Sequence, residues 1–330
     1  MRLLMAFMTP ALGAALGLVL TAASAPAQTY PSRPVTLVVS FAPGGLSDIP
    51  ARILATELQQ RIGQSVVVEN RTGASGVVGA TSVLRAEPDG HTLLVNAIAD
   101  TQNLHYINVP YSAVNDFEPI GMIADGPPLV LMVPNSTPYK SVADIIADAK
   151  ANPKKVNFAS SGPASSPAIA ISQLNSLAKS EIADVPYRGS GAAAQALLTG
   201  EVQGSFVFMS TARQYSDDNK ARAIAIAQSK RFPLWPDLPT MSEQGFQGFD
   251  HGGFIGLVAP AKTPKHIIAY LNKHLNEALA SPELRKKFAA LGMTVPPAAD
   301  NTPEKFKAFL VNETARQGEL AKLTAPKKPN

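Results

Sequence analysis

One stretch near the start of the chain constrains the fold most strongly, because it combines a buried strand, a glycine turn and a helix. Residues 36–41 are β-branched and aromatic, which suits a buried strand. Pro43-Gly44-Gly45 ends the strand, since proline cannot donate to a ladder and glycine accepts unusual dihedrals. Ser47 and Asp48 are favourable N-cap residues, apolar residues then recur at helical spacing, and Gly63 is placed to end the helix.

Such a turn is suited to bind a carboxylate or a phosphate, because free backbone N–H groups and the positive end of the helix dipole converge there. An ordinary βα turn of the kind that α/β proteins repeat many times is the alternative interpretation. The stretch lacks the full patterns G-x-G-x-x-G and G-x-x-x-x-G-K-[ST], so nucleotide binding is not supported.

A second unit of the same kind lies near the middle of the chain. Residues 156–159 suit a strand, residues 160–167 form a turn rich in serine, and a helix is predicted over residues 168–179. The serines of this turn can cap the helix and present hydroxyl donors. A flexible surface loop is the alternative.

Further strands and helices alternate along the rest of the chain, which predicts α/β domains with parallel sheets. The segment 97–116 is expected to be irregular and polar. The other expected strands are 65–69, 91–96, 119–123, 129–133, 182–187, 204–208, 223–227 and 254–258. The other expected helices are 77–86, 141–151, 192–198, 265–280, 282–291 and 303–322.

The first 27 residues have the pattern of a secretory signal peptide. Arg2 precedes an apolar run, and Ala25-Pro26-Ala27 is an A-x-A site that predicts cleavage near Ala27. A retained membrane anchor is the alternative, but the run is short and contains Pro10. The chain has no cysteine, which an exported protein tolerates when its domains are large enough to build their own core.

Charge excludes one class of partner. The formal net charge is +4, and the basic residues are scattered without a basic stripe interleaved with aromatic residues. This distribution argues against binding to nucleic acid.

Eight sequence blocks follow one another along the chain after the signal peptide. They are YPSRPVTLVVSFAPGGLSDIPAR, VVVENRTGASGVVGA, EPDGHTLLV, NDFEPIG, KKVNFASSG, VPYRGSGAA, LPTMSEQGF and GLVAPAKTPKHII. In order and spacing this series resembles the Bug family, the extracytoplasmic solute-binding proteins of tripartite tricarboxylate transporters. Each block alone is weak, but the ordered series is specific and covers nearly all of the chain after residue 27.

The resemblance implies a periplasmic-binding-protein (Venus-flytrap) fold, in which two α/β lobes are joined by two crossing strands. Lobe one is expected to comprise residues 29–128 plus 254–330 and lobe two residues 129–253, with the crossings near 129–133 and 254–258. The resemblance further implies a periplasmic monomer that delivers a small carboxylate to the membrane components of a tripartite tricarboxylate transporter. It implies no cofactor, no metal and no catalytic residue.

In that fold the two turns face each other across a cleft, so each can hold one carboxylate of a dicarboxylate. Family members hold one end of the ligand mainly with backbone amides and bound water. The ligand-binding residues expected in lobe one are Phe41, Ala42, Pro43, Gly44, Gly45, Leu46, Ser47 and Asp48. Those expected in lobe two are Ser160, Ser161, Gly162, Ser165, Ser166, Arg188, Val207 and Phe208.

Departures from the common family pattern lower the polarity of the expected cleft. Ala168 stands where histidine is usual, Val207 where aspartate is usual, Phe254 where tryptophan is common, and Leu46 where serine or threonine is frequent. Without the aspartate, a ligand ammonium lacks a partner, which disfavours aspartate and glutamate as ligands. An apolar or aromatic diacid, such as terephthalate or a medium-length aliphatic diacid, fits better. Core packing of Val207 and Met209, away from any ligand, is the alternative.

Two other classes of function are compatible with export. A ligand sensor that partners a membrane histidine kinase would use the same fold. A serine hydrolase would need a nucleophile, a base and an oxyanion hole, but the chain lacks G-x-S-x-G and the metal motif H-E-x-x-H. Of its histidines, His251 lies in a glycine-rich connection, and we expect it to be structural or exposed to solvent; a position near the cleft is the alternative.

Overall fold

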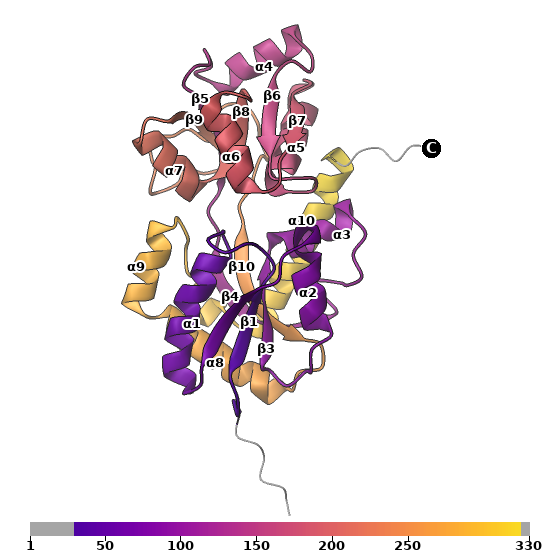
Figure 1. Ribbon diagram of the computed structural model, residues 1–330, viewed down its shortest axis with the longest axis vertical. Coiled ribbons are helices and arrows are strands. Elements are labelled where there is room, and N and C mark those ends of the chain that lie inside the picture. Colours follow the sequence, from indigo (N-terminus) through magenta and orange to yellow (C-terminus); the bar gives the residue numbers. More distant parts are fainter. Residues whose placement is uncertain (1–29, 325–330) are drawn as a thin grey trace, which may run out of the picture.

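Two five-stranded sheets, each covered by helices, form two α/β lobes stacked along the long axis of the molecule (Figure 1). The computed structural model describes residues 30–324, so the signal peptide expected over residues 1–27 lies outside the described residues. The periplasmic-binding-protein architecture expected from the resemblance is confirmed. Within residues 30–324, every helix is too short or too polar to cross a membrane.

The sheet of lobe one has the strand order β2-β1-β3-β10-β4. β1 is parallel to β2 and β3, whereas β10 is antiparallel to both β3 and β4, so the sheet is mixed and not wholly parallel as expected. Its strands are β1 (Val35–Val39), β2 (Val66–Asn70), β3 (Thr92–Ala97), β4 (Phe117–Asp125) and β10 (Phe254–Pro260). Its helices are α1 (Asp48–Ile62), α2 (Val77–Leu84), α3 (Ile98–Tyr106), α8 (Lys265–Leu279), α9 (Pro282–Ala290) and α10 (Pro303–Thr324), with short 3-10 turns at Ala74–Gly76 and Ala298–Asp300.

The sheet of lobe two has the strand order β7-β6-β8-β5-β9 and is mixed in the same way. β6 is parallel to β7 and β8, and β5 is antiparallel to β8 and β9. Its strands are β5 (Leu129–Pro134), β6 (Asn157–Ser160), β7 (Ala183–Pro186), β8 (Gly204–Phe208) and β9 (Ala221–Ile226). Its helices are α4 (Val142–Ala151), α5 (Ser166–Ala178), α6 (Ser190–Thr199) and α7 (Met209–Asp217).

The antiparallel strands reflect the path of the chain between the lobes. The chain leaves the first sheet after β4, enters the second at β5, and returns to the first as β10. We propose lobe boundaries that follow this path, with residues 29–128 plus 254–330 in lobe one and residues 129–253 in lobe two.

Helices on both faces of each sheet explain why the strands are almost continuously apolar. In β1, Leu37 belongs to the core under α1 and α8, while its neighbour Val38 belongs to the core under α2 and α10. Both side chains are 0 % exposed. Alternation of apolar and polar residues is lost when both faces of a strand are buried, and the short apolar runs of the sequence follow from this.

The expectation that residues 97–116 are irregular is wrong, because α3 lies within this segment. Asp100 caps the helix by accepting the backbone N–H of Ala97 at 2.8 Å. The buried face of α3 carries the polar residues Thr101, Gln102 and Asn103, so the usual apolar periodicity of a helix is missing. α7 also lacked a clear signal, since most of its residues are polar and only Met209 and Ala212 are buried.

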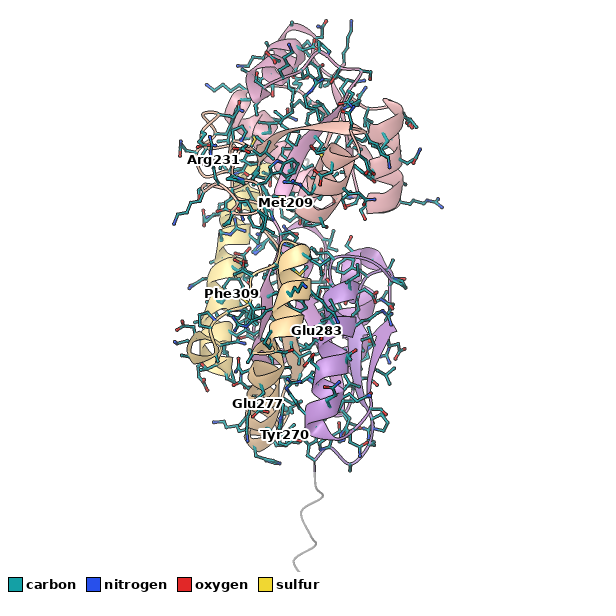
Figure 2. The ribbon with its side chains drawn as sticks, turned by 90° about the vertical axis from the view of Figure 1, so that its left-hand side faces the viewer. Met209, Arg231, Tyr270, Glu277, Glu283 and Phe309 are labelled. Carbon is teal, nitrogen blue, oxygen red and sulfur yellow. The ribbon has the colours of Figure 1, made fainter. Side chains whose placement is uncertain are left out.

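The two lobes touch along one side of the molecule, where α3, α5 and α10 meet (Figure 1). The hydroxyl of Ser172 on α5 donates to the carbonyl of Thr324 at the end of α10, at 2.8 Å. The hydroxyl of Ser166 donates to Oε1 of Gln102 on α3 at 3.2 Å. Figure 2 shows Met209 at the edge of lobe two that faces α9.

Candidate ligand-binding site

The turn between β1 and α1 is organised by Asp48, whose side chain is buried. The backbone N–H of Gly44 donates to Oδ2 of Asp48 at 2.8 Å, and Nε of Arg52 donates to the same oxygen at 3.0 Å. The amide of Asn70 donates to Oδ1 at 2.8 Å. Burial alone would raise the pKa of Asp48, but the hydrogen bonds from Arg52, Gly44 and Asn70 outweigh it and hold the pKa below its usual value. Asp48 is therefore an ionised anchor that fixes the shape of the turn.

The same turn leaves backbone N–H groups for an anion. The amide of Gly45 donates to Ala42 and that of Asp48 donates to Gly45, whereas the amides of Leu46 and Ser47 donate no hydrogen bond within residues 30–324. Helix α1 has no side-chain cap on its first turn. Uncapped N–H groups at a helix start carry partial positive charge and favour a carboxylate.

The corresponding turn of lobe two is more self-contained. Ser165 caps α5 by accepting the N–H of Ala168 at 3.4 Å, and Ser166 bonds across the lobes to Gln102. Ser160 is 0 % exposed at the end of β6. Ser161 alone among the serines of this turn borders the space between the lobes.

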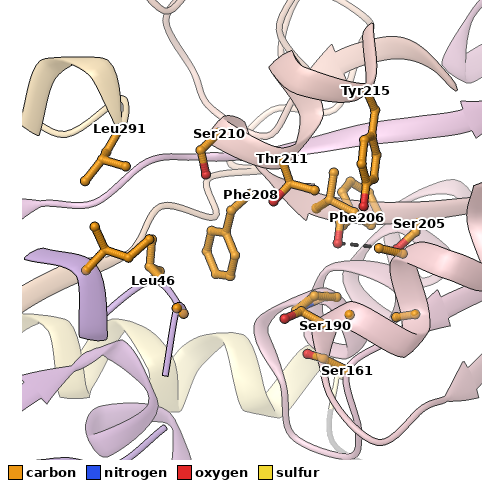
Figure 3. Close-up of a pocket in the computed structure, with 18 of the residues that line it drawn as sticks. Leu46, Ser161, Ser190, Ser205, Phe206, Phe208, Ser210, Thr211, Tyr215 and Leu291 are labelled. Carbon is orange, nitrogen blue, oxygen red and sulfur yellow. Dashed lines mark hydrogen bonds between the residues drawn. The ribbon is translucent and has the colours of Figure 1, made fainter. Parts of the chain in front are cut away.

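A cavity of ≈ 200 Å³ lies between the lobes and is lined by residues of both (Figure 3). Its larger apolar walls come from Leu46, Ile49, Phe206, Val207, Phe208 and Leu291. Its hydroxyl groups come from Ser161, Ser190, Ser205, Ser210, Thr211 and Tyr215. Within the described part of the chain, its lining includes no Asp, Glu, Lys, Arg or His. Such a cavity suits a ligand with an apolar body whose polar ends accept hydrogen bonds from hydroxyls and backbone amides.

The structure brings together part of the site expected from the sequence. The expected residues that line the cavity are Gly44, Gly45, Leu46, Ser161, Val207 and Phe208. The expected residues outside its lining are Phe41, Ala42, Pro43, Ser47, Asp48, Ser160, Gly162, Ser165, Ser166 and Arg188. Arg188 is exposed, and Met209 packs in the core of lobe two.

Several lining residues were missed, and most come from α6, from α7 and from the segment after α9. They include Ser190, Ser210, Thr211, Tyr215, Leu291 and Met293. The R-G-S-G turn before α6 was a usable signal for Ser190. No signal marked Thr211 or Tyr215, because α7 was not predicted. Phe254 is not among the residues that line the cavity, and its ring packs edge-on against that of Phe309, with ring centroids 5.0 Å apart.

Three histidines are engaged with groups other than serine hydroxyls. Nε2 of His91 accepts the backbone N–H of Ser32 at 3.3 Å, and Nε2 of His105 lies 2.9 Å from the carbonyl of Thr314. His251 is buried against Gln173, and burial lowers the pKa of His251 to about 3, with a smaller contribution from the positive charge of Arg316. His251 is thus a neutral structural residue. Among residues 30–324, no cluster of three or more His, Asp or Glu is arranged to hold a metal ion.

Comparison with known proteins agrees with this architecture. Residues 50–325 match the profile of a family described as "Tripartite tricarboxylate transporter family receptor". Protein BugT of Bordetella pertussis is 35% identical over 309 residues, which cover 93% of this chain and 94% of BugT.

Two solved structures have nearly the same fold. MatC of Rhodopseudomonas palustris with bound malate has a TM-score of 0.82 at 32% identity, covering 88% of this chain and 100% of that one. Rpa4515 of R. palustris with adipate also has a TM-score of 0.82, at 30% identity, covering 89% of this chain and 98% of that one.

Proposed function

Because the chain belongs to the tripartite tricarboxylate transporter receptor family, we propose that it is a periplasmic solute-binding protein for a small organic dicarboxylate. In this proposal the signal peptide expected over residues 1–27 directs export, and the mature protein is a monomer. It delivers its ligand to the membrane components of a tripartite tricarboxylate transporter. The observation that carries the proposal is the cavity between the lobes, which pairs apolar walls with hydrogen-bond donors and, among residues 30–324, is lined by no ionised side chain.

The lining favours a diacid with an apolar or aromatic body. Leu46 of lobe one and Phe208 of lobe two border the same cavity, with Phe208 near its centre in Figure 3. Val207 presents methyl groups at the position of the usual family aspartate, so a ligand ammonium would find no carboxylate here. Terephthalate and medium-length aliphatic diacids have an apolar body and carry no ammonium group. The neighbours described with malate and with adipate support a diacid as the ligand class.

Both lobes contribute to binding, and this couples the ligand to closure. The free amide of Leu46 lies on lobe one, and the six hydroxyl groups of the lining lie on lobe two. A diacid gains its second set of contacts only when the lobes approach, so it stabilises the closed form. We infer that the transporter distinguishes loaded from empty protein by this closed form.

A thermal-shift screen of mature residues 28–330 tests the proposal. The panel contains terephthalate, isophthalate, adipate, malate, citrate, nicotinate, aspartate and glutamate. A ligand at 100 times its Kd stabilises the folded protein by about 2.7 kcal/mol, which raises the melting temperature by several degrees. We expect a rise with terephthalate or adipate and none with aspartate or glutamate. A rise with amino acids alone would overturn the ligand class, and no rise with any acid would overturn the function.

A further inference from the structure

We propose that Tyr215, assisted by Thr211 and Ser190, receives the second carboxylate of the ligand and makes the protein select diacids over monoacids. This inference rests on the proposed function. It assigns the lobe-two end of the cavity to residues of α6 and α7, and not to the serine turn before α5 that the sequence suggested.

The Tyr215 hydroxyl is the first observation. Tyr215 is half-buried on α7 and lines the cavity, and Figure 3 shows its ring extending toward Phe206 and Ser205. Within residues 30–324 the hydroxyls of Tyr30, Tyr106, Tyr111, Tyr139 and Tyr187 each have a hydrogen-bond partner, whereas those of Tyr215 and Tyr270 have none. Of these two, Tyr215 lines the cavity and Tyr270 does not. No group in the same range bonds to the Tyr215 hydroxyl, which leaves it available to a ligand.

Two helix starts that border the same cavity are the second observation. α6 begins after Gly189 and α7 after Phe208, and neither helix has a side-chain cap on its first turn. α5 is different, because Ser165 accepts the N–H of Ala168. The uncapped donors of lobe two are therefore those of α6 and α7.

Space at the start of α6 allows a ligand to reach these donors. A Cβ placed on Gly189 or Gly191 would meet nothing within 4 Å. Ser190, between them, lines the cavity, and its side chain is drawn in Figure 3. Thr211 lies on the first turn of α7 and lines the same cavity.

The chemistry of this end selects an anion that only accepts hydrogen bonds. The hydroxyls of Tyr215, Thr211 and Ser190 each donate one hydrogen bond, and the two helix starts add partial positive charge. Ser205 is not part of this set, because its hydroxyl already donates to the carbonyl of Ala159 at 2.9 Å. A carboxylate satisfies all these donors, whereas a methyl group in the same place leaves them unpaired.

Calorimetric titration of four proteins with two matched pairs of acids tests the proposal. The first pair is terephthalate and 4-methylbenzoate, which share the ring and one carboxylate and differ in the second. The proteins are the wild type, Tyr215→Phe, Thr211→Val and the control Tyr187→Phe, whose hydroxyl lies outside the cavity and bonds to Glu201 at 2.7 Å. Adipate and hexanoate are the second pair, for a cavity that prefers an aliphatic body.

The wild type should bind the diacid more tightly than the monoacid. Tyr215→Phe removes a hydrogen bond to a charged carboxylate, so it should weaken diacid binding by about 10-fold, and Thr211→Val should weaken it by a smaller factor. Both variants should bind the monoacid with unchanged affinity. Tyr187→Phe should bind both acids like the wild type.

If Tyr215→Phe lost the same affinity for the diacid as for the monoacid, the side chain would only shape the cavity, and the inference would be overturned. Unchanged diacid affinity in both Tyr215→Phe and Thr211→Val would also overturn it while leaving the proposed function intact. If the wild type binds none of the four acids, the proposed function itself fails. Melting curves of each variant without ligand separate these results from loss of folding.

Discussion

Replacing Asp48 by asparagine tests whether this residue holds the ligand turn in shape. Asn is nearly isosteric, but it offers one acceptor oxygen and turns an NH₂ group toward the donors that the carboxylate now satisfies. The donors are the backbone N–H of Gly44 and the amide of Asn70, each at 2.8 Å, and Nε of Arg52 at 3.0 Å. The change therefore breaks the bond from Gly44 or the bond from Asn70.

The expected loss of unfolding free energy follows from the surroundings of each bond. The Asp48 side chain is 2 % exposed, so its bonds to Gly44 and Asn70 are those of a buried charge, each contributing about 1.5–3 kcal/mol. The Arg52 side chain is 51 % exposed, so its ion pair contributes no more than about 1 kcal/mol. We expect Asp48→Asn to lower the free energy of unfolding by about 2–4 kcal/mol.

Urea unfolding followed by circular dichroism measures this loss. Glu69→Gln is the matched control, because Glu69 pairs with Arg71 at 2.8 Å on the same lobe but the two side chains are 48 % and 32 % exposed. The control should lose less than about 1 kcal/mol. Since the pKa of Asp48 is held below its usual value, its stabilisation is present above pH 4 and disappears as the pH falls through the folded-state pKa. Equal loss in Asp48→Asn and Glu69→Gln at pH 7 would refute this assignment.

Other substitutions probe the cavity and the buried ionisable groups. Gly44 and Gly63 flank the same helix with φ of +77° and +68° and open space at the Cβ, but only Gly44 lines the cavity. Gly44→Val and Gly63→Val should therefore each lower the free energy of unfolding by about 1–2 kcal/mol. Only Gly44→Val should weaken acid binding in calorimetry, and equal affinities of the two variants would contradict a binding site at Gly44. Burial raises the pKa of Asp100 to about 6. Protonation of Asp100 therefore stabilises the native state at low pH, and this stabilisation is lost as the pH rises from 4 to 6. In urea unfolding, the free energy of unfolding should therefore fall by roughly 3 kcal/mol less between pH 4 and 7 in Asp100→Asn than in the wild type. An equal fall in both proteins would contradict this role of Asp100. Burial lowers the pKa of His251 to about 3, so stability present above pH 6.5 is lost as the pH falls toward 3. His251→Gln should flatten the acid side of the stability curve, whereas an unchanged acid limb would show that His251 is accessible to protons in the native state.

The sequence was sufficient where local chemistry decides the structure. The apolar run of β1, the glycines after it and the stop at Gly63 are local signals, and Gly63 indeed ends α1 with φ of +68°. Ser281 caps α9 as its sequence predicts, by accepting the N–H of Leu284. The eight ordered blocks supplied the family and the fold class, which the periodicity of the elements alone did not.

The remaining features depend on contacts between distant parts of the chain. α3 was missed because its buried face is polar and its partners, such as Ser75 for Asn103, are remote in sequence. Asp48 looked like a ligand residue, and only the fold shows it bonded to Asn70 on β2. Tyr215 enters the cavity because α7 turns back across β5 and β9, and no motif in the sequence records that geometry.

A crystal structure of the mature protein grown with the diacid that raises its melting temperature most tests the central claim directly. We expect the acid between Leu46 and Phe208, one carboxylate on the backbone amide of Leu46 and the other on the hydroxyls of Tyr215 and Thr211. Density for the acid at any other place, with this cavity empty at saturating concentration, would contradict the account.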